Sequence, residues 1–205
     1  PRPMKSAASI LVFVALLRAA ACTGSKSFSK KGAKLDASGM YGEAADMFLQ
    51  SALRNPNNVD AKIGLKKTGQ QLLNDKLGAF FKAFNMGTDK EAAVNAYLDA
   101  KDYHDRVARA GVSLDVPDSY AADFAQVKGD FLTQLYAQGQ SLMDQKDYQA
   151  AQAVFAKIGK LEPDYKDAHS LEETAYLEPL YLSGKASFSA GLYRRAYGTL
   201  DSVVA

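Results

Sequence analysis

Bulky apolar, small and turn-forming residues recur in the same order and at the same spacing in three segments of the chain. The first segment contains Phe28, Gly32, Tyr41, Ala44, Phe48 and Pro56. The second contains Leu135, Gly139, Tyr148, Ala151, Phe155 and Pro163. The third contains Leu180, Gly184, Tyr193, Ala196 and Leu200, and the sequence ends before its proline is due. Antiparallel helices joined by a tight turn pack closely only where side chains are small. The pattern therefore predicts three helix pairs, in which glycine and alanine make the close contact and the bulky residues fill the space around it.

The central part of the chain also predicts helices, but without a clear repeat. Residues 59–85 predict one long helix, with apolar positions at Ile63, Leu72, Leu73, Leu77, Phe80, Phe81 and Phe84. Thr88 to Glu91 has the composition of a capping box, which predicts a helix reaching about Ala110. Residues 111–117 predict a loop, and Asp118 or Ser119 is expected to cap another long helix. Residues 164–176 predict an additional helix before Pro179 bends or breaks the path.

The three segments resemble the tetratricopeptide repeat (TPR), a helix–turn–helix unit of about 34 residues. The matches cover residues 25–58, 132–165 and 177–205, a little under half of the chain. The resemblance implies an all-α, TPR-like solenoid with lengthened, irregular central helices. The expected organisation is a signal peptide at 1–22, a tether and first unit at 23–58, an irregular hairpin region at 59–131, and two units with an extra helix at 132–205, the last one truncated.

The resemblance also implies roles for particular side chains. Tyr41, Tyr148 and Tyr193 occupy the turn position, where the family uses an aromatic residue for packing. In TPR proteins the first helix of each pair lines a concave groove that receives partner peptides. On that basis the candidate groove residues are Tyr136, Gln140, Met143, Tyr181, Lys185 and Phe188. The alternative, that these side chains pack against the lengthened neighbouring helices, stays open.

The first 22 residues have the layout of a secretory signal peptide. Met4 and Lys5 begin a short basic region, residues 7–17 are uninterruptedly apolar, and small residues precede Cys22. An apolar run of this length is shorter than the roughly 20 residues that span a bilayer. The small residues before Cys22 resemble a bacterial lipobox, which predicts acylation of Cys22 and a lipid-anchored protein of the cell envelope, at the outer membrane. A plain cleaved signal and a retained membrane anchor are the alternatives.

Residues 23–34 contain four lysines and no acidic residue. Beside an acylated cysteine they would lie near lipid head groups, where each lysine gains about 1 kcal/mol from an anionic leaflet. The simpler interpretation is a solvated tether that leads into the first helix.

Charge and cysteine content exclude some classes of function. The chain has 25 basic and 23 acidic residues, and three of the basic ones precede Cys22. The remaining part is close to neutral, without the basic surface that nucleic-acid binding requires. A single cysteine cannot form an internal disulfide bond.

Candidate catalytic chemistry is sparse. His104 and His169 lie far apart in the sequence without a nearby cysteine, so we expect solvated histidines and no metal site. The acidic residues between Asp99 and Asp105, and the pair Glu172 and Glu173, are interpreted as solvated helix faces. No nucleophile elbow, P-loop or zinc-protease motif occurs. The sequence thus predicts no enzyme and no cofactor.

The leading hypothesis is a non-catalytic scaffold that binds other proteins or peptides through its helical solenoid. The alternative is the N-terminal recognition region of a longer protein, whose downstream domain carries an enzymatic or pore-forming activity. A binding protein for a small ligand or polysaccharide is a third hypothesis, which would need a deep polar pocket. Because Leu200, Val203 and Val204 lack a following helix, we also expect the native chain to continue beyond Ala205.

Overall fold

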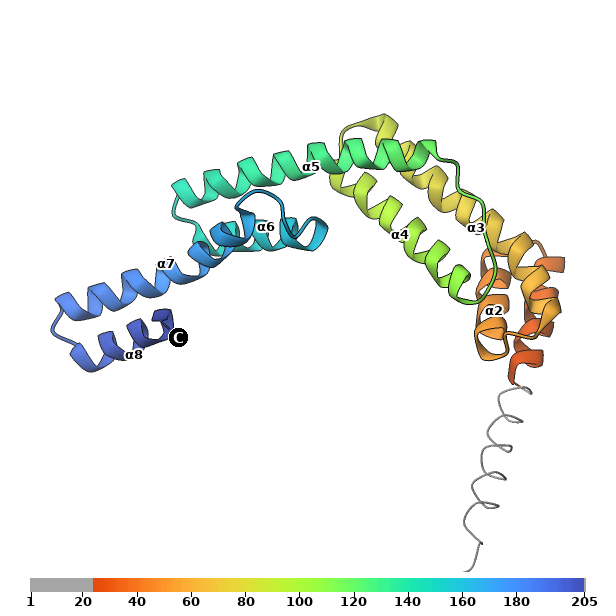
Figure 1. The fold of residues 1–205 in the computed structure, drawn as a ribbon, viewed down its shortest axis with the longest axis horizontal. Helices are drawn as coiled ribbons and strands as arrows, with labels where there is room; N and C mark the ends of the chain where they lie inside the picture. Colours follow the sequence, from red (N-terminus) through yellow and green to blue (C-terminus); the bar gives the residue numbers. More distant parts are fainter. Residues whose placement is uncertain (1–23, 205) are drawn as a thin grey trace, which may run out of the picture. The chain divides into compact units, whose positions relative to one another are not determined.

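A computed structural model describes residues 24–204, and all regular secondary structure in this range is helical (Figure 1). The N-terminal helix occupies residues 24–37. It is followed by α2 (Tyr41–Arg54), α3 (Val59–Met86), α4 (Lys90–Arg109), α5 (Ser119–Asp144), α6 (Tyr148–Leu161), α7 (Ala168–Ser189) and α8 (Tyr193–Val204). Within the described range, no helix is both long enough and apolar enough to cross a membrane. The predicted signal peptide and Cys22 lie outside the described residues.

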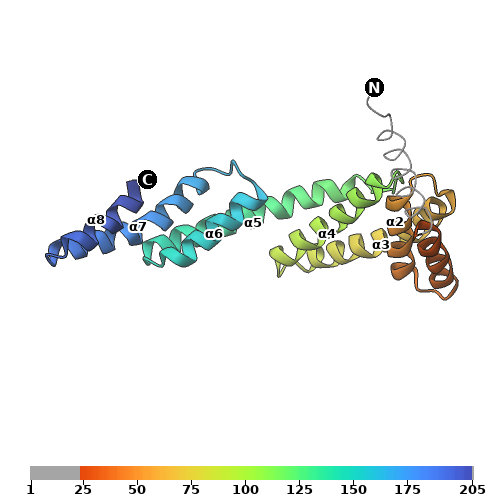
Figure 2. The same cartoon turned by 90° about the horizontal axis from the view of Figure 1, so that it is seen from below.

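The chain divides into two compact units, residues 1–127 and 128–205. In the first unit α3 packs against both α2 and α4, and in the second unit α7 packs against both α6 and α8. Figure 2 shows α3–α4 and α7–α8 as helical hairpins. Helices therefore pack against their neighbours in the sequence, which confirms the predicted all-α, solenoid type of fold.

The three predicted glycine contacts all occur. A methyl group added at Gly32 would lie 3.0 Å from the ring of Phe48, and one at Gly139 would lie 2.6 Å from the ring of Phe155. At Gly184 it would lie 2.6 Å from Leu200. Ala44, Ala151 and Ala196 are buried, with at most 2% of their surface exposed. The close approach of the two helices in each pair thus follows from the residue types that the sequence places there.

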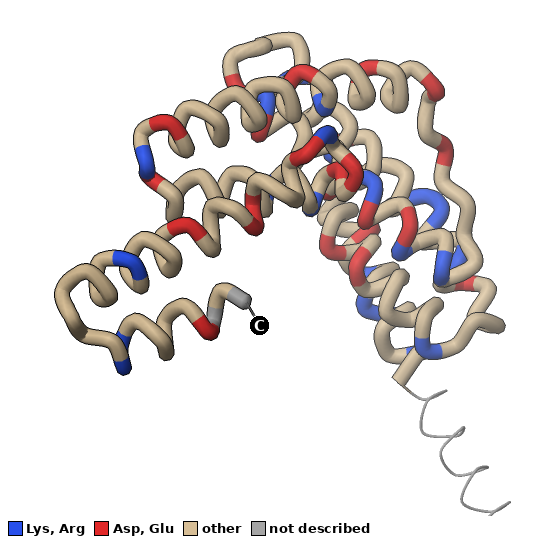
Figure 3. Tube along the Cα trace, turned by 60° about the vertical axis from the view of Figure 1, so that its left-hand side comes forward, with Lys and Arg blue, Asp and Glu red and all other residues tan. Residues whose placement is uncertain are grey.

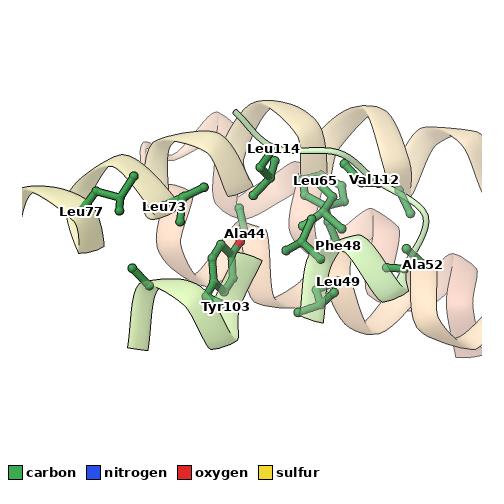
Figure 4. Close-up of a cluster of buried hydrophobic side chains, with 14 residues drawn as sticks. Ala44, Phe48, Leu49, Ala52, Leu65, Leu73, Leu77, Tyr103, Val112 and Leu114 are labelled. Atoms are coloured by element: carbon green, nitrogen blue, oxygen red, sulfur yellow. The ribbon is translucent and has the colours of Figure 1, made fainter. Parts of the chain in front are cut away.

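The core of the first unit is formed by side chains of α2, α3, α4 and the loop that follows α4 (Figure 4). Phe48 and Leu49 of α2 meet Leu65 of α3, and Leu114 of the loop closes this cluster. The ring of Tyr103 is buried in the same cluster, where its hydroxyl has no hydrogen-bond partner within the described residues. Burial raises the pKa of Tyr103 to about 12, because the phenolate form would lose its hydration.

Residues 24–37 form the N-terminal helix, as the repeat match over residues 25–58 implied, so the described part of the segment interpreted as a tether is helical. A buried hydrogen-bond network holds the start of this helix. The Ser25 hydroxyl donates to the Ser51 carbonyl (2.9 Å), and the Ser51 hydroxyl donates to the Ser25 carbonyl (2.7 Å). The side-chain amide of Asn58 donates to both hydroxyl oxygens, at 3.0 and 3.1 Å. Burying these polar groups is tolerated because they satisfy one another.

Two predicted helix boundaries are also wrong. The side chain of Asp89, not Thr88, caps α4 and accepts a hydrogen bond from the Ala92 N–H. The helix predicted before Pro179 begins at Ala168 and not at residue 164, since residues 164–167 form turns, and it continues unbroken through the proline as α7. A proline removes one helical hydrogen bond at a cost of about 3 kcal/mol. We attribute the continuity of α7 to its packing against both α6 and α8, which offsets that cost.

Candidate protein-binding surface

The α7–α8 hairpin carries the exposed apolar surface from which a candidate binding site can be built. α7 ends at Ser189, and Gly191 takes a left-handed conformation with φ of 74°. The Leu192 N–H donates to the Ser187 carbonyl, which closes the turn before α8 begins at Tyr193. This tight turn brings the Phe188 and Tyr193 rings into edge-to-face contact, 5.4 Å apart.

Aromatic side chains project from this hairpin into solvent. Phe188 is 61% exposed, Tyr193 is 64% exposed and Tyr197 is 74% exposed. Together with Ala196, Leu200 and Asp201 they line a hollow of about 560 Å³. We call this hollow the α8 surface. One carboxylate is its only ionisable group apart from the tyrosines, so its lining is mainly apolar and aromatic.

The first helix pair shows what covers the same positions elsewhere in the molecule. Tyr41, at the start of α2, donates a hydrogen bond to Asp75 of α3 at 2.9 Å, and this bond raises the pKa of Tyr41. Phe48 of α2 also meets α3, where a methyl group at Gly64 would lie 2.5 Å from its ring. By the repeat spacing, Tyr193 and Leu200 of α8 correspond to Tyr41 and Phe48. Phe48 is thus buried by the following helix, whereas Tyr41 contacts that helix through its hydroxyl and stays 37% exposed.

The second helix pair has the same arrangement. α7 packs on α6, and Gly159 of α6 faces the Glu172 carboxylate of α7. α8 is the last helix within the described residues, and the equivalent face lies open. The α8 surface is therefore the kind of helix face that packs against another helix in both earlier pairs.

Basic residues border the α8 surface. Arg194 and Arg195 are exposed beside Tyr193, and they line a second hollow of about 570 Å³ with Gly191 and Leu192. Lys185 is exposed on α7, and Figure 3 marks these three residues in blue on the hairpin. An acidic partner would therefore find complementary charge at this edge.

The structure places the predicted groove residues in different surroundings. Tyr181, Lys185 and Phe188 of α7 are exposed, as is Gln140 of α5, whereas Met143 is half-buried. Of the six, Phe188 lines the α8 surface.

Tyr136 is held by residues of α6 and of the turn that follows it. Its hydroxyl donates to Asp167, its ring makes edge-to-face contacts with Phe155 and Tyr165, and the Lys166 ammonium lies 4.2 Å from the ring centre. The hydrogen bond to Asp167, together with burial, raises the pKa of Tyr136. These contacts favour the packing alternative for Tyr136, and the groove formed by the other residues stays a prediction.

Sequence reasoning missed Tyr197 and misplaced Tyr193. The expected packing role of the turn tyrosines fits Tyr41, through its bond to Asp75, but Tyr193 has no such helix beside it. The sequence signal for this surface was Leu200, because no further repeat follows it in the given sequence to cover its helix face.

The expected catalytic and metal-binding candidates do not form a cluster. His104 lies 3.4 Å from Asp105 on the same helix, and His169 is exposed at the start of α7. Among the described residues there is no group of three or more histidine, cysteine, aspartate or glutamate side chains placed to hold a metal ion.

Comparison of the chain with models of protein families, with curated proteins and with solved structures gives no match.

Proposed function

We propose that this chain is a TPR-type scaffold of the bacterial cell envelope, without catalytic activity, which binds other proteins through its helical solenoid. We propose further that its α8 surface binds a helix of another protein, unless a helix that follows Ala205 in the native chain packs there. The observation that carries the proposal is the open aromatic face of α8. Tyr193 and Tyr197 are exposed there, although the corresponding faces of α2 and α6 are covered by helices. Exposed aromatic anchors around a mainly apolar hollow are typical of protein-binding surfaces.

The helix pairs of the chain define the partner's chemistry. A helix that packed on α8 as α3 packs on α2 would present a small residue to Leu200, as Gly64 does to Phe48. It would also present a carboxylate to Tyr193, as Asp75 does to Tyr41. Arg194 and Arg195 at the edge favour further acidic residues. The proposed partner is therefore an amphipathic, acidic α-helix of another protein.

Site-specific photo-crosslinking in cells tests this proposal. A benzoylphenylalanine in place of Tyr197 should crosslink to one partner, and the crosslinked peptide should lie in an acidic helical segment. The matched control is the same group in place of Gln134, an exposed residue of α5. Crosslinks of equal yield from both positions, or crosslinks only to a second copy of this chain, would contradict the proposal.

Binding to the identified partner then gives a quantitative test. Because aromatic anchors at an interface contribute about 2 kcal/mol or more, Tyr197→Asp should weaken binding by at least about 30-fold. The helix content by circular dichroism should stay unchanged, since the side chain is exposed. Gln134→Asp is the control and should bind like the wild type.

The second part of the proposal is a lipid anchor on Cys22, which rests on the sequence pattern around that residue. Stable attachment needs more than one acyl chain, and a diacylated cysteine would supply it. Mass spectrometry of the mature protein should show a lipid-modified Cys22 at the N-terminus. Cys22→Ser should leave the precursor uncleaved or release the protein from membranes. A mature chain without lipid would refute this part and leave the binding proposal in place.

A further inference from the structure

The N-terminal helix presents a row of exposed lysines beside its packed side. Ser25, Ser29 and Gly32 are buried against the rest of the first unit. Lys26, Lys30 and Lys34 follow one another at intervals of four residues and are all exposed. At a rise of 1.5 Å per residue, this lysine row extends over about 12 Å.

The charges of the lysine row are not neutralised within the described part of the chain. Lys66, Lys67, Lys76, Lys101 and Lys128 each form an ion pair with a carboxylate. No such pair occurs for Lys26, Lys30 or Lys34 among the described residues. The nearest acidic residue of this helix, Asp36, is paired with Lys67 of α3 at 2.8 Å. Figure 3 marks the basic residues of this helix in blue.

The row has a fixed orientation on the folded unit. The buried network of Ser25, Ser51 and Asn58 ties the start of the helix to α2 and α3. The contact between Gly32 and Phe48 ties its middle to α2. The lysines are therefore presented by a rigid surface and not by a flexible chain.

A polar hollow of about 370 Å³ adjoins the row. Lys26 and Lys30 line it together with Ser29 and the asparagines at positions 55, 57 and 58. One carboxylate, Asp60 at the start of α3, also lines this hollow. The lining thus contains two ammonium groups and several amides but one carboxylate. Its net positive charge makes the hollow suited to an anion.

We infer that the lysine row is a docking surface for an anionic phospholipid membrane. Six residues separate the apolar run at residues 7–17 from the start of the helix, and only Thr23 separates Cys22 from it. A membrane that holds either this run or an acylated Cys22 would therefore lie close to the lysines. Lysines near an anionic bilayer surface gain free energy from the negative surface potential, which falls off within a Debye length. The inference rests on the proposed attachment of the N-terminal segment to a membrane and does not depend on the proposed partner helix.

Other polyanions fit the row less well. Base and phosphate recognition in nucleic acids relies on arginine forks and on aromatic residues that stack on bases. The row consists of lysines alone, and Phe28 on the same helix is half-buried with Arg54 4.1 Å above its ring. An anionic bilayer surface attracts such point charges without requiring a specific geometry.

The experiment measures partition of the full-length chain between water and lipid vesicles. Vesicles of phosphatidylcholine alone are compared with vesicles that also contain phosphatidylglycerol. The apolar run contributes equally to the two partition coefficients. Their ratio therefore measures the contribution of the charged surface alone. Each lysine is expected to raise the preference for phosphatidylglycerol about fivefold. The triple variant Lys26→Gln/Lys30→Gln/Lys34→Gln should therefore lower this preference about 100-fold. The preference of the wild type should also fall as salt is added.

Two further variants separate position from charge. Lys82→Gln/Lys90→Gln/Lys160→Gln has the same change in net charge at other sites and should keep the preference within about threefold, because none of these lysines belongs to the row. Lys26→Arg/Lys30→Arg/Lys34→Arg keeps the charge and should bind like the wild type. An equal loss in both glutamine triples, or no effect of phosphatidylglycerol on the wild type, would overturn the inference. Binding to duplex DNA as tight as to the anionic vesicles, with the same dependence on the row, would overturn its assignment to membranes.

Discussion

The first and the last helix pairs share one local design and differ in what surrounds it. In both pairs a glycine of the first helix lies against a large side chain of the second, Gly32 against Phe48 and Gly184 against Leu200. Phe48 is buried, because α3 covers its other side through Gly64. Leu200 is half-buried and lines an open hollow. The same sequence pattern thus produces a core residue at one place and a half-buried residue at another.

The difference shows that helix pairing and burial have separate causes. Pairing depends on small and large residues at a spacing that one hairpin can satisfy by itself. Burial of the second helix requires a further helix, which α3 supplies for α2 and α7 supplies for α6. In a solenoid each unit buries its surface only against its neighbours, so a helix face without a neighbour among the described residues stays open there.

The largest expected effect comes from shortening the large side chain of each pair. Phe48→Ala should destabilise the first unit by about 3–5 kcal/mol, because it leaves a cavity between two helices. Leu200→Ala should cost less than about 2 kcal/mol, since its site is already open to water on one side. Urea unfolding followed by circular dichroism measures both values. Equal costs would mean that Leu200 is as well covered as Phe48.

Adding a methyl group to the glycines should give the next largest effect. Gly139→Ala should cost about 1–3 kcal/mol, because the ring of Phe155 is fully buried and cannot move away. Gly184→Ala should cost less than about 1 kcal/mol, since Leu200 at its open site can shift and alanine favours the helix. Gly78→Ala is the control: no atom lies within 4 Å of the added methyl group. It should stabilise the chain by about 0.5–1 kcal/mol. If Gly184→Ala and Gly139→Ala lowered the free energy of unfolding by the same amount, the proposed difference in packing between the two pairs would be contradicted.

A smaller effect depends on pH and concerns the buried phenol of the first unit. The pKa of Tyr103 is about 12 in the folded chain, against a usual value of 10.0. Between these two pH values the folded chain keeps the proton of the Tyr103 hydroxyl, whereas the unfolded chain loses it. The resulting stabilisation is fully present below pH 10 and is lost as the pH rises towards 12. Urea midpoints of the wild type should therefore fall more steeply over this interval than those of Tyr103→Phe. Parallel curves for the two proteins would contradict the assigned burial of the hydroxyl group.

The smallest expected effect on stability is at the α8 surface. Tyr197→Asp should change the free energy of unfolding by less than about 0.5 kcal/mol, because the side chain contributes little to the fold. The corresponding residue of the first pair, Ala45, is fully buried. Ala45→Asp should therefore destabilise the first unit severely, since an unpaired charge would be buried. Thermal unfolding of the two variants compares the two faces directly, and a large loss for Tyr197→Asp would place Tyr197 in a core.

Much of the fold could be predicted from the sequence. Pro56 and Pro163 follow the ends of α2 and α6, as expected for residues that cannot continue a helix. The glycine contacts of all three pairs were predictable, because residues on one helix face recur with the 3.6-residue period. The sequence by itself also determined where the lysines of the N-terminal helix stand relative to one another.

The tertiary structure alone decided which of these faces are covered. Ser25 and Ser51 are 26 residues apart, and no local pattern indicated that they would share buried hydrogen bonds. The continuity of α7 through Pro179 depends on contacts made on both of its sides. Tyr41 and Tyr193 have equivalent positions in the repeat, yet one reaches Asp75 of a neighbouring helix and the other reaches solvent. Helical periodicity is a local property of the backbone, whereas burial depends on residues that the chain brings together from a distance.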